Sequence, residues 1–193
     1  MAVASGCHRL FVGCPLPSGI AAEVHRWAAG AGLGPEARLV PAERLHVTLL
    51  FYPSVSDADL PFLSGLVRET VWAPIGVASG PVERFSMSAL ALVLKPDEEV
   101  ERALLDRMGG RVSPDDPLCQ LVCRLGDAEM ERFRRTLRRG MRWHVTIARL
   151  APGGSVTSPP QPPKWSFALD RLVLFESRLG AGGSRYTPLA ESG

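Results

Sequence analysis

The 193-residue sequence has no run of about eighteen uncharged apolar residues, the length that a membrane-spanning helix requires. Its first residues lack the basic start and long apolar stretch of a secretory signal. It also lacks a glycine-rich dinucleotide-binding pattern and a phosphate loop ending in Gly-Lys-Ser or Gly-Lys-Thr. These absences argue against a membrane protein, a secreted protein and the common nucleotide-binding enzymes.

Cysteine and lysine are scarce as well. The four cysteines are Cys7, Cys14, Cys119 and Cys123. Their spacing does not match paired zinc knuckles, so we expect reduced thiols, a cytoplasmic protein, and neither a metal nor another cofactor. Only two lysines occur, so most positive charge comes from arginine, whose planar guanidinium suits phosphate oxygens. A GC-rich genome would explain the same bias, so charge alone argues only weakly for an anionic partner.

The remaining composition is ordinary for a globular protein, with 46% hydrophobic and 22% charged residues. The length fits one compact domain or two intimately packed lobes. Sequence patterns predict strands over 8–14, 45–52, 75–82, 88–94, 118–125, 141–150, 167–175 and 184–189. They predict helices over 18–31, 57–70, 96–108 and 127–139. We expect Ser18 to cap the first helix and Ser56 with Asp59 to open the second. Strands mixed with helices in no regular alternation indicate an α+β fold.

One five-residue pattern occurs twice, about half a chain length apart. The copies are Arg44-Leu45-His46-Val47-Thr48 and Arg142-Trp143-His144-Val145-Thr146, each followed by a branched apolar residue. The chain has four histidines, so half of them belong to this pattern. The repetition indicates two similar halves that each present one copy.

Strand geometry gives the repeated pattern a chemical meaning, because side chains two positions apart share a face. The Arg, His and Thr of each copy would face one way, and the apolar residues between them would face a core. Two imidazoles with ordinary pKa values of about 6.5 supply a general base and a general acid near neutral pH. Threonine hydroxyls and guanidiniums donate hydrogen bonds to anionic oxygens. This set of groups fits in-line displacement at phosphorus without a metal.

A single His-x-Thr is most often structural, and only its repetition in matched strand contexts favours catalysis. His8 and His25 lack such surroundings. We interpret them as a strand-edge residue and a helix-surface residue.

The runs His46-Val47-Thr48-Leu49 and His144-Val145-Thr146-Ile147 resemble the two H-x-T-x motifs of the 2H phosphoesterase superfamily. The closer resemblance is to its bacterial and archaeal RNA 2′,3′-cyclic phosphodiesterases, historically called 2′-5′ RNA ligases. It extends over most of the chain, through the runs 9–12, 40–46, 144–149, 172–179, 182–183 and 186–189.

The resemblance implies a single bilobal domain over residues 1–193, with two mostly antiparallel sheets, outer helices and an approximate internal two-fold axis. The H-x-T strands, with motifs at 46–49 and 144–147, would face a central groove. The implied reaction opens a terminal 2′,3′-cyclic phosphate on RNA, in tRNA-like fragments or small oligonucleotides, and leaves a 2′-phosphate. The reverse reaction, 2′-5′ RNA ligation, uses the same site. We expect a monomer with no membrane partner.

The resemblance also implies roles for individual residues. His46 would protonate the departing 3′ oxygen and His144 would activate water. Thr48 and Thr146 would hold the non-bridging oxygens, and Arg149 would help to neutralise the phosphate.

The arginines are ranked differently by strand parity and by the family pattern. Arg44 and Arg142 share the parity of the histidines, whereas Arg149 has the wrong parity for a regular strand. Arg149 reaches the site only if the strand bends or ends near Ala148. The chain also departs from the family at Leu50 and Pro53, where Lys and Gly are frequent, and over 111–127.

Two other functions fit the same residues. One is a 2H enzyme acting on another cyclic or 2′-5′-linked nucleotide. The other is a non-catalytic RNA-binding module whose binding would survive removal of the histidines.

Overall fold

The computed structural model describes residues 6–98, 142–151, 153–154, 161–180 and 183–192. Its strands are β1 (Cys7–Pro15), β2 (Ala37–Leu39), β3 (His46–Ser56), β4 (Ile75–Ser86), β5 (Ala89–Pro96), β6 (His144–Leu150), β7 (Ser166–Leu169), β8 (Val173–Gly180) and β9 (Gly183–Glu191). Its helices are α1 (Ser18–Gly30), α2 (Leu60–Glu69) and the 3₁₀ turn η1 (Ala42–Arg44). The predictions that fall on 99–141, among them two helices, a strand and two cysteines, lie outside the described residues.

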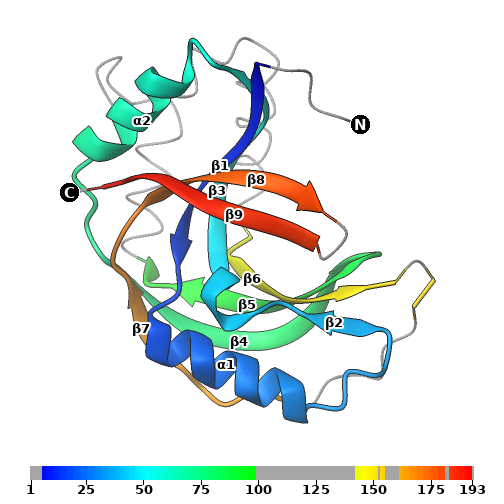
Figure 1. Ribbon diagram of the computed structural model, residues 1–193. Coiled ribbons are helices and arrows are strands. Elements are labelled where there is room, and N and C mark those ends of the chain that lie inside the picture. The colour runs from blue at the N-terminus through cyan, green and yellow to red at the C-terminus, as the bar shows by residue number, and fades with distance from the viewer. Residues whose placement is uncertain (1–5, 99–141, 152, 155–160, 181–182, 193) are drawn as a thin grey trace.

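The described strands form one antiparallel sheet in the order β7-β4-β5-β6-β3-β1-β8-β9, with β2 beside β6. The two expected sheets are therefore joined. The junction is a single residue pair, Val47 of β3 with Val145 of β6. Figure 1 shows β8 and β9 on one side of this junction and β4 and β5 on the other. The predicted mostly antiparallel α+β class is confirmed.

Each helix covers a different half of the sheet (Figure 1). α1 packs against η1, β2 and β6, whereas α2 packs against β8 and β9. α1 begins at Ser18 itself, directly after Pro17, so Ser18 is not its cap. The capping contact expected of Ser56 is present, because the Asp59 amide donates to Ser56 Oγ at 3.3 Å, but α2 begins only at Leu60. Among the described residues, no helix is long and apolar enough to cross a bilayer.

Several predicted strand boundaries are wrong; the strand predicted over 75–82, for example, continues to Ser86. β3 continues past Pro53 to Ser56, because the missing amide of Pro53 falls at an irregularity in the pairing with β1, where the ladder needs no donor. The strand predicted over 167–175 is two strands. β7 pairs with β4 and β8 pairs with β1, so residues 170–172 carry the chain from one half to the other.

The core lies on the sheet face opposite the polar residues of the repeated pattern. Leu10, Val12, Val47 and Val145 are at most 1% exposed and belong to it. The two helices contribute Val24, Leu63 and Val67. Burial of this much apolar surface is the main force that fixes the strand faces. The alternation predicted for the two His-x-Thr strands therefore follows from which of their residues are apolar.

Candidate active site

The two His-x-Thr sequences lie side by side at the junction of the two halves. Val47 and Val145 are paired and both point into the core, so the residues on either side of each point to the opposite face. Because the strands are antiparallel, His46 lies toward Thr146 and Thr48 lies toward His144. Two imidazoles and two hydroxyls that are distant in the sequence thus share one small region of the sheet face.

Both imidazoles are held by the same kind of hydrogen bond. The Nδ1 atom of His46 lies 2.7 Å from the Arg44 carbonyl oxygen, and that of His144 lies 2.7 Å from the Arg142 carbonyl oxygen. A carbonyl only accepts, so each Nδ1 donates and the neutral ring keeps its lone pair on Nε2. Each histidine therefore presents Nε2 as its chemically available nitrogen.

Each imidazole is also stacked on a phenylalanine. The rings of Phe11 and His46 are 4.6 Å apart at centroid, and those of Phe85 and His144 are 3.7 Å apart. Tyr186 meets His46 edge-on at 5.1 Å. Sequence reasoning missed these aromatic supports. The signal for Phe11 was its alternation with core residues Leu10 and Val12, which places it on the polar face.

A β-bulge follows the threonine in both motifs. Thr48 pairs with Gly13 and Leu50 with Val12, so Leu49 is extra. In the second copy Ile147 is extra, because Thr146 pairs with Ala91 and Ala148 with Leu90. One extra residue reverses the alternation of every residue that follows.

The bulge places Arg149 on the face of His144. The β5 partners of His144, Thr146 and Arg149 are Val93, Ala91 and Ala89, which are two residues apart and share a face. Arg149 therefore faces the site, although in a regular strand its parity would place it on the opposite face. The equivalent position after the first motif is Phe51, an exposed residue paired with Phe11. The guanidinium carbon of Arg9 lies 4.6 Å above the Phe51 ring.

Gly13 allows the first bulge. A Cβ at this position would lie 2.5 Å from the Val47 carbonyl oxygen and 3.5 Å from His46 Cδ2. The clash is with backbone, which cannot swing away, so only glycine fits here. This close approach keeps β1 against the His46 strand.

Arg44 and Arg142 both lie ahead of the strands whose parity was used to place them. Arg44 lies in η1, ahead of the strand, and its Nη1 donates to the Ser184 carbonyl oxygen at 3.1 Å. Arg142 also precedes its strand, stands over the Phe85 ring and donates to Glu83 at 3.1 Å. Their strand parity was therefore no guide, because neither residue lies on a strand.

The other two histidines have structural partners. His8 bonds Glu176 at 2.9 Å and Asp57 at 2.7 Å, and these carboxylates raise its pKa. His8 lies next to the first residue of β1, a strand that runs between β3 and β8. His25 lies on α1, as predicted, and its ring bonds the Val40 carbonyl. No cluster of metal-ligating side chains occurs within the described ranges.

Comparisons with known proteins identify the family of the chain. The chain is 30% identical over 185 residues to the RNA 2′,3′-cyclic phosphodiesterase of Escherichia coli K12, covering 94% of this chain and 93% of that protein. The chain belongs to the 2H phosphoesterases, in their RNA 2′,3′-cyclic phosphodiesterase branch. It is therefore a hydrolase, which counts against a non-catalytic RNA-binding module. No family model matches the sequence.

Several solved structures share the fold of this chain. The E. coli protein LigT complexed with NADP+ aligns with a TM-score of 0.63 and 26% identity over 97% of both chains. A structure described as a phosphoesterase aligns with a TM-score of 0.61 and 25% identity, covering 95% of this chain and 96% of that chain. A Thermus thermophilus protein gives a TM-score of 0.64 at 22% identity, covering 95% of this chain and 96% of that chain, and shows the fold alone.

The electrostatics of this phosphoesterase site differ from the sequence expectation. The pKa of His46 is lowered to about 4, mainly by burial and to a lesser degree by the charge of Arg149 and of His144 when protonated, against the opposing hydrogen bond to the Arg44 carbonyl. The pKa of His144 is also lowered, first by burial and then by Arg142 and Arg149. Both imidazoles are thus mainly neutral at pH 7, rather than one neutral and one protonated. Arg149 acts electrostatically on both.

These pKa directions predict an acidic optimum for kcat/KM on a cyclic phosphate substrate. An acid and base pair of imidazoles works with one ring protonated and the other neutral, and kcat/KM reports the pKa values of the free enzyme. We expect activity to fall below about pH 4 and again above a pKa lower than the ordinary 6.5. Bound phosphate raises both pKa values, so kcat should peak at higher pH. Initial rates across pH would test this, and a kcat/KM optimum above pH 7 would contradict it.

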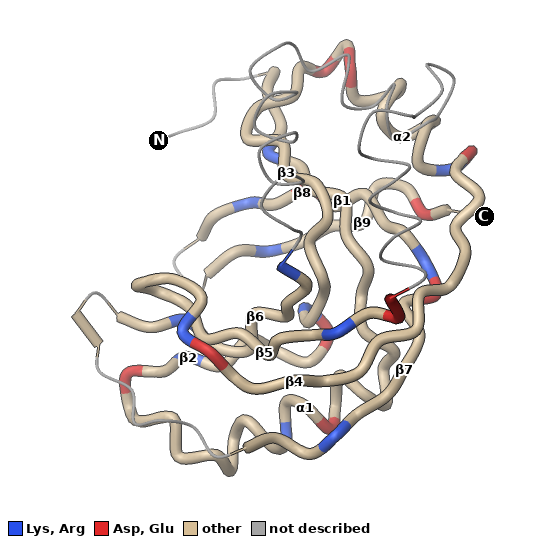
Figure 2. The backbone as a smooth tube through the Cα atoms, turned by 180° about the vertical axis from the view of Figure 1, so that it is seen from behind, with Lys and Arg blue, Asp and Glu red and all other residues tan. Residues whose placement is uncertain are grey.

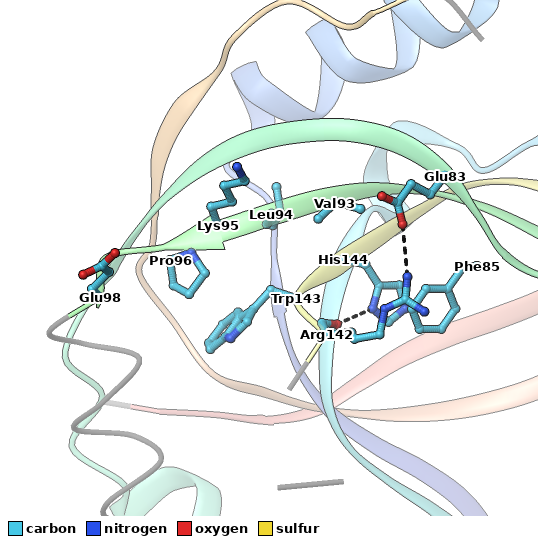
Figure 3. Close-up of a pocket in the computed structure, with 10 residues that line it drawn as sticks. All are labelled: Glu83, Phe85, Val93, Leu94, Lys95, Pro96, Glu98, Arg142, Trp143 and His144. Carbon is cyan, nitrogen blue, oxygen red and sulfur yellow. Dashed lines mark hydrogen bonds and ion pairs between the residues drawn. The ribbon is translucent and has the colours of Figure 1, made fainter. Parts of the chain in front are cut away.

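A pocket of about 460 Å³ opens beside His144 (Figure 3). Its lining residues come from β4, from β5 and the segment after it, and from the start of β6 and the segment before it: Glu83, Phe85, Val93, Leu94, Lys95, Pro96, Glu98, Arg142, Trp143 and His144. Figure 3 shows Arg142 between the Glu83 carboxylate and the Phe85 ring, next to the imidazole. The second histidine of this phosphoesterase therefore borders a space with aromatic, cationic and anionic walls.

Proposed function

We propose that this protein hydrolyses RNA 2′,3′-cyclic phosphate ends to 2′-phosphates without a metal, using His46 and His144 as an acid and base pair. The observation that carries the proposal is the junction at Val47 and Val145, which brings two imidazoles onto one face. In each imidazole Nδ1 is occupied by a carbonyl and Nε2 is available. Two matched histidines with free Nε2 atoms are the groups that this reaction needs.

The proposed step moves two protons and exchanges one bond to phosphorus. Water attacks the cyclic phosphate and gives its proton to Nε2 of His144. The bond from phosphorus to the 3′ oxygen breaks, and protonated His46 gives its Nε2 proton to that oxygen. The products are a 3′-hydroxyl and a 2′-phosphate. Because the pKa of His46 is about 4 in the free site, His46 gains its proton with the anionic substrate, whose charge favours the imidazolium.

The remaining site residues would bind the phosphate. Thr48 and Thr146 would donate to its non-bridging oxygens, and Arg149 would balance its charge. Arg149 is supported by its electrostatic effect on both histidines. Arg142 would assist from the His144 side, and Arg44 would shape the site through Ser184.

The solved structures of LigT support a site for phosphate groups. That protein has been crystallised with phosphate and with ATP, at 26% identity to this chain. The curated E. coli relative is named for RNA 2′,3′-cyclic phosphate. We extend these ligands to this chain and propose tRNA-like fragments or small oligonucleotides as substrates of a monomeric, bilobal cytoplasmic enzyme. Reverse 2′-5′ ligation would use the same groups.

Side-by-side assays of defined substrates test the proposed specificity. We expect an RNA ending in 2′,3′-cyclic phosphate to be hydrolysed at least about tenfold faster, in kcat/KM, than 3′,5′-cyclic AMP or a 2′-5′-linked diadenylate. The reason is that the strained five-membered ring presents its 3′ oxygen in line with the attacking water, so orientation supplies much of the rate. Preference for either of the other substrates would instead favour the alternative 2H activity.

A further inference from the structure

Arg38 is a basic residue beside the site that the motifs did not identify. It lies on β2 and pairs directly with Arg149 on β6, and both side chains are exposed. Directly opposed residues on neighbouring strands share a face. Because the bulge puts Arg149 on the face of His144 and Thr146, Arg38 extends that face by one strand.

Two opposed arginines are unfavourable by themselves, since like charges directly across a sheet repel. Several other arginines of the described residues have carboxylate partners: Arg142 pairs with Glu83, Arg171 with Glu191, and Arg178 with Glu176. Neither Arg38 nor Arg149 has a hydrogen bond or ion pair to another residue of this described part. Figure 2 shows basic positions on the strands around the centre of the molecule. An anion between or beside the two guanidiniums would remove the repulsion.

The guanidinium of Arg38 is held near the other half of the sheet. A Cβ at Gly183 would lie 2.7 Å from Arg38 Nη2, so the group packs directly on the Gly183 backbone. Gly183 has φ of +99° and begins β9. Arg44 reaches the same turn through its hydrogen bond to Ser184. The start of β9 therefore fixes Arg38 in a position close to the site.

We infer that Arg38 binds the backbone phosphate on the 5′ side of the cyclic end, while Arg149 faces the cyclic phosphate itself. The inference rests on the proposed function. Each guanidinium offers planar, paired donors that suit a phosphate, so adjacent arginines match adjacent phosphates of one strand. The substrate class is then an oligonucleotide of at least two residues, which a mononucleotide lacking the second phosphate matches less well.

The test compares adenosine 2′,3′-cyclic phosphate with the dinucleotide ApA ending in the same cyclic phosphate. The measurement is the ratio of kcat/KM for the dinucleotide to that for the mononucleotide. We expect Arg38→Gln to lower this ratio about tenfold, because it removes a charge-assisted hydrogen bond. We also expect the slope of log kcat/KM against log salt for the dinucleotide to shrink by about 0.7. Arg171→Gln is the matched control, and Arg38→Lys should retain most of the salt dependence.

Each outcome decides the inference separately from the proposed function. An unchanged ratio in Arg38→Gln, or an equal loss on both substrates, would overturn the phosphate role of Arg38. Hydrolysis of the mononucleotide by the parent protein, lost in His46→Asn, would still support the catalytic proposal. If the parent protein hydrolysed neither the mononucleotide nor the dinucleotide, both the proposed function and the inference that rests on it would be overturned.

Discussion

Replacing either motif histidine should lower kcat/KM on 2′,3′-cyclic phosphate RNA by about 10² to 10⁴, the contribution of one placed acid or base. The most informative substitutions are His46→Asn and His144→Asn. The asparagine amide occupies the place of Nδ1 and keeps the donor to the Arg44 or Arg142 carbonyl, but it has no Nε2. Loss of activity in these variants therefore reports the missing nitrogen. Initial rates of product release measure it.

The matched control for this prediction is His25→Asn. His25 also uses Nδ1 to contact a carbonyl, that of Val40, and lies on α1 away from the junction. It should keep the parent rate within about twofold, as expected of substitutions without a part in the chemistry. Near-parental hydrolysis by either motif variant would mean that the corresponding imidazole takes no part in proton transfer.

Replacing Arg149 should have the second largest effect, a loss of about 10² in kcat/KM, comparable with removal of one donor to a developing charge. Its charge lowers the pKa of both histidines, so it lies within electrostatic reach of both sides of the reaction. Arg149→Gln should also raise both pKa values and shift the kcat/KM profile to higher pH. Kinetics across pH measure both consequences in one experiment.

Arg142→Gln provides the comparison for Arg149. Arg142 is paired with Glu83, its side chain is 60% exposed, and it lowers the pKa of His144 alone. Exposed ion pairs are weak, so its loss should cost less than about tenfold. A larger loss in Arg142→Gln than in Arg149→Gln would reverse the ranking and make Arg142 the more important of the two arginines.

The buried face of each motif strand could be predicted from the sequence, because apolar and polar residues alternate along it and the apolar ones must face the core. Most strand positions could also be predicted, including the pairing of β8 with β9. The joining of the two halves into one sheet depends on a single pair, Val47 with Val145, and such long-range contacts leave no local pattern.

The positions of the arginines could not be predicted from the sequence, because the register between strands decides which face of the sheet each one lies on. The bulges at Leu49 and Ile147 arise from pairing with other strands, and one extra residue changed the face of Arg149. Arg38 escaped notice because β2 has three residues, too few for a periodic pattern. The shifted pKa values of His46 and His144 depend on burial, which neighbours far away in the sequence create.

The central claim, that the two imidazoles act together without a metal, is tested most directly by the His46→Asn/His144→Asn double variant. Its rate of 2′-phosphate formation from RNA ending in 2′,3′-cyclic phosphate is measured beside the parent and both single variants, all in EDTA. We expect full parental activity in EDTA and a double variant little slower than either single one, because groups that act as a unit are lost as a unit. Parental activity abolished by EDTA, or losses that multiply in the double variant, would contradict the claim.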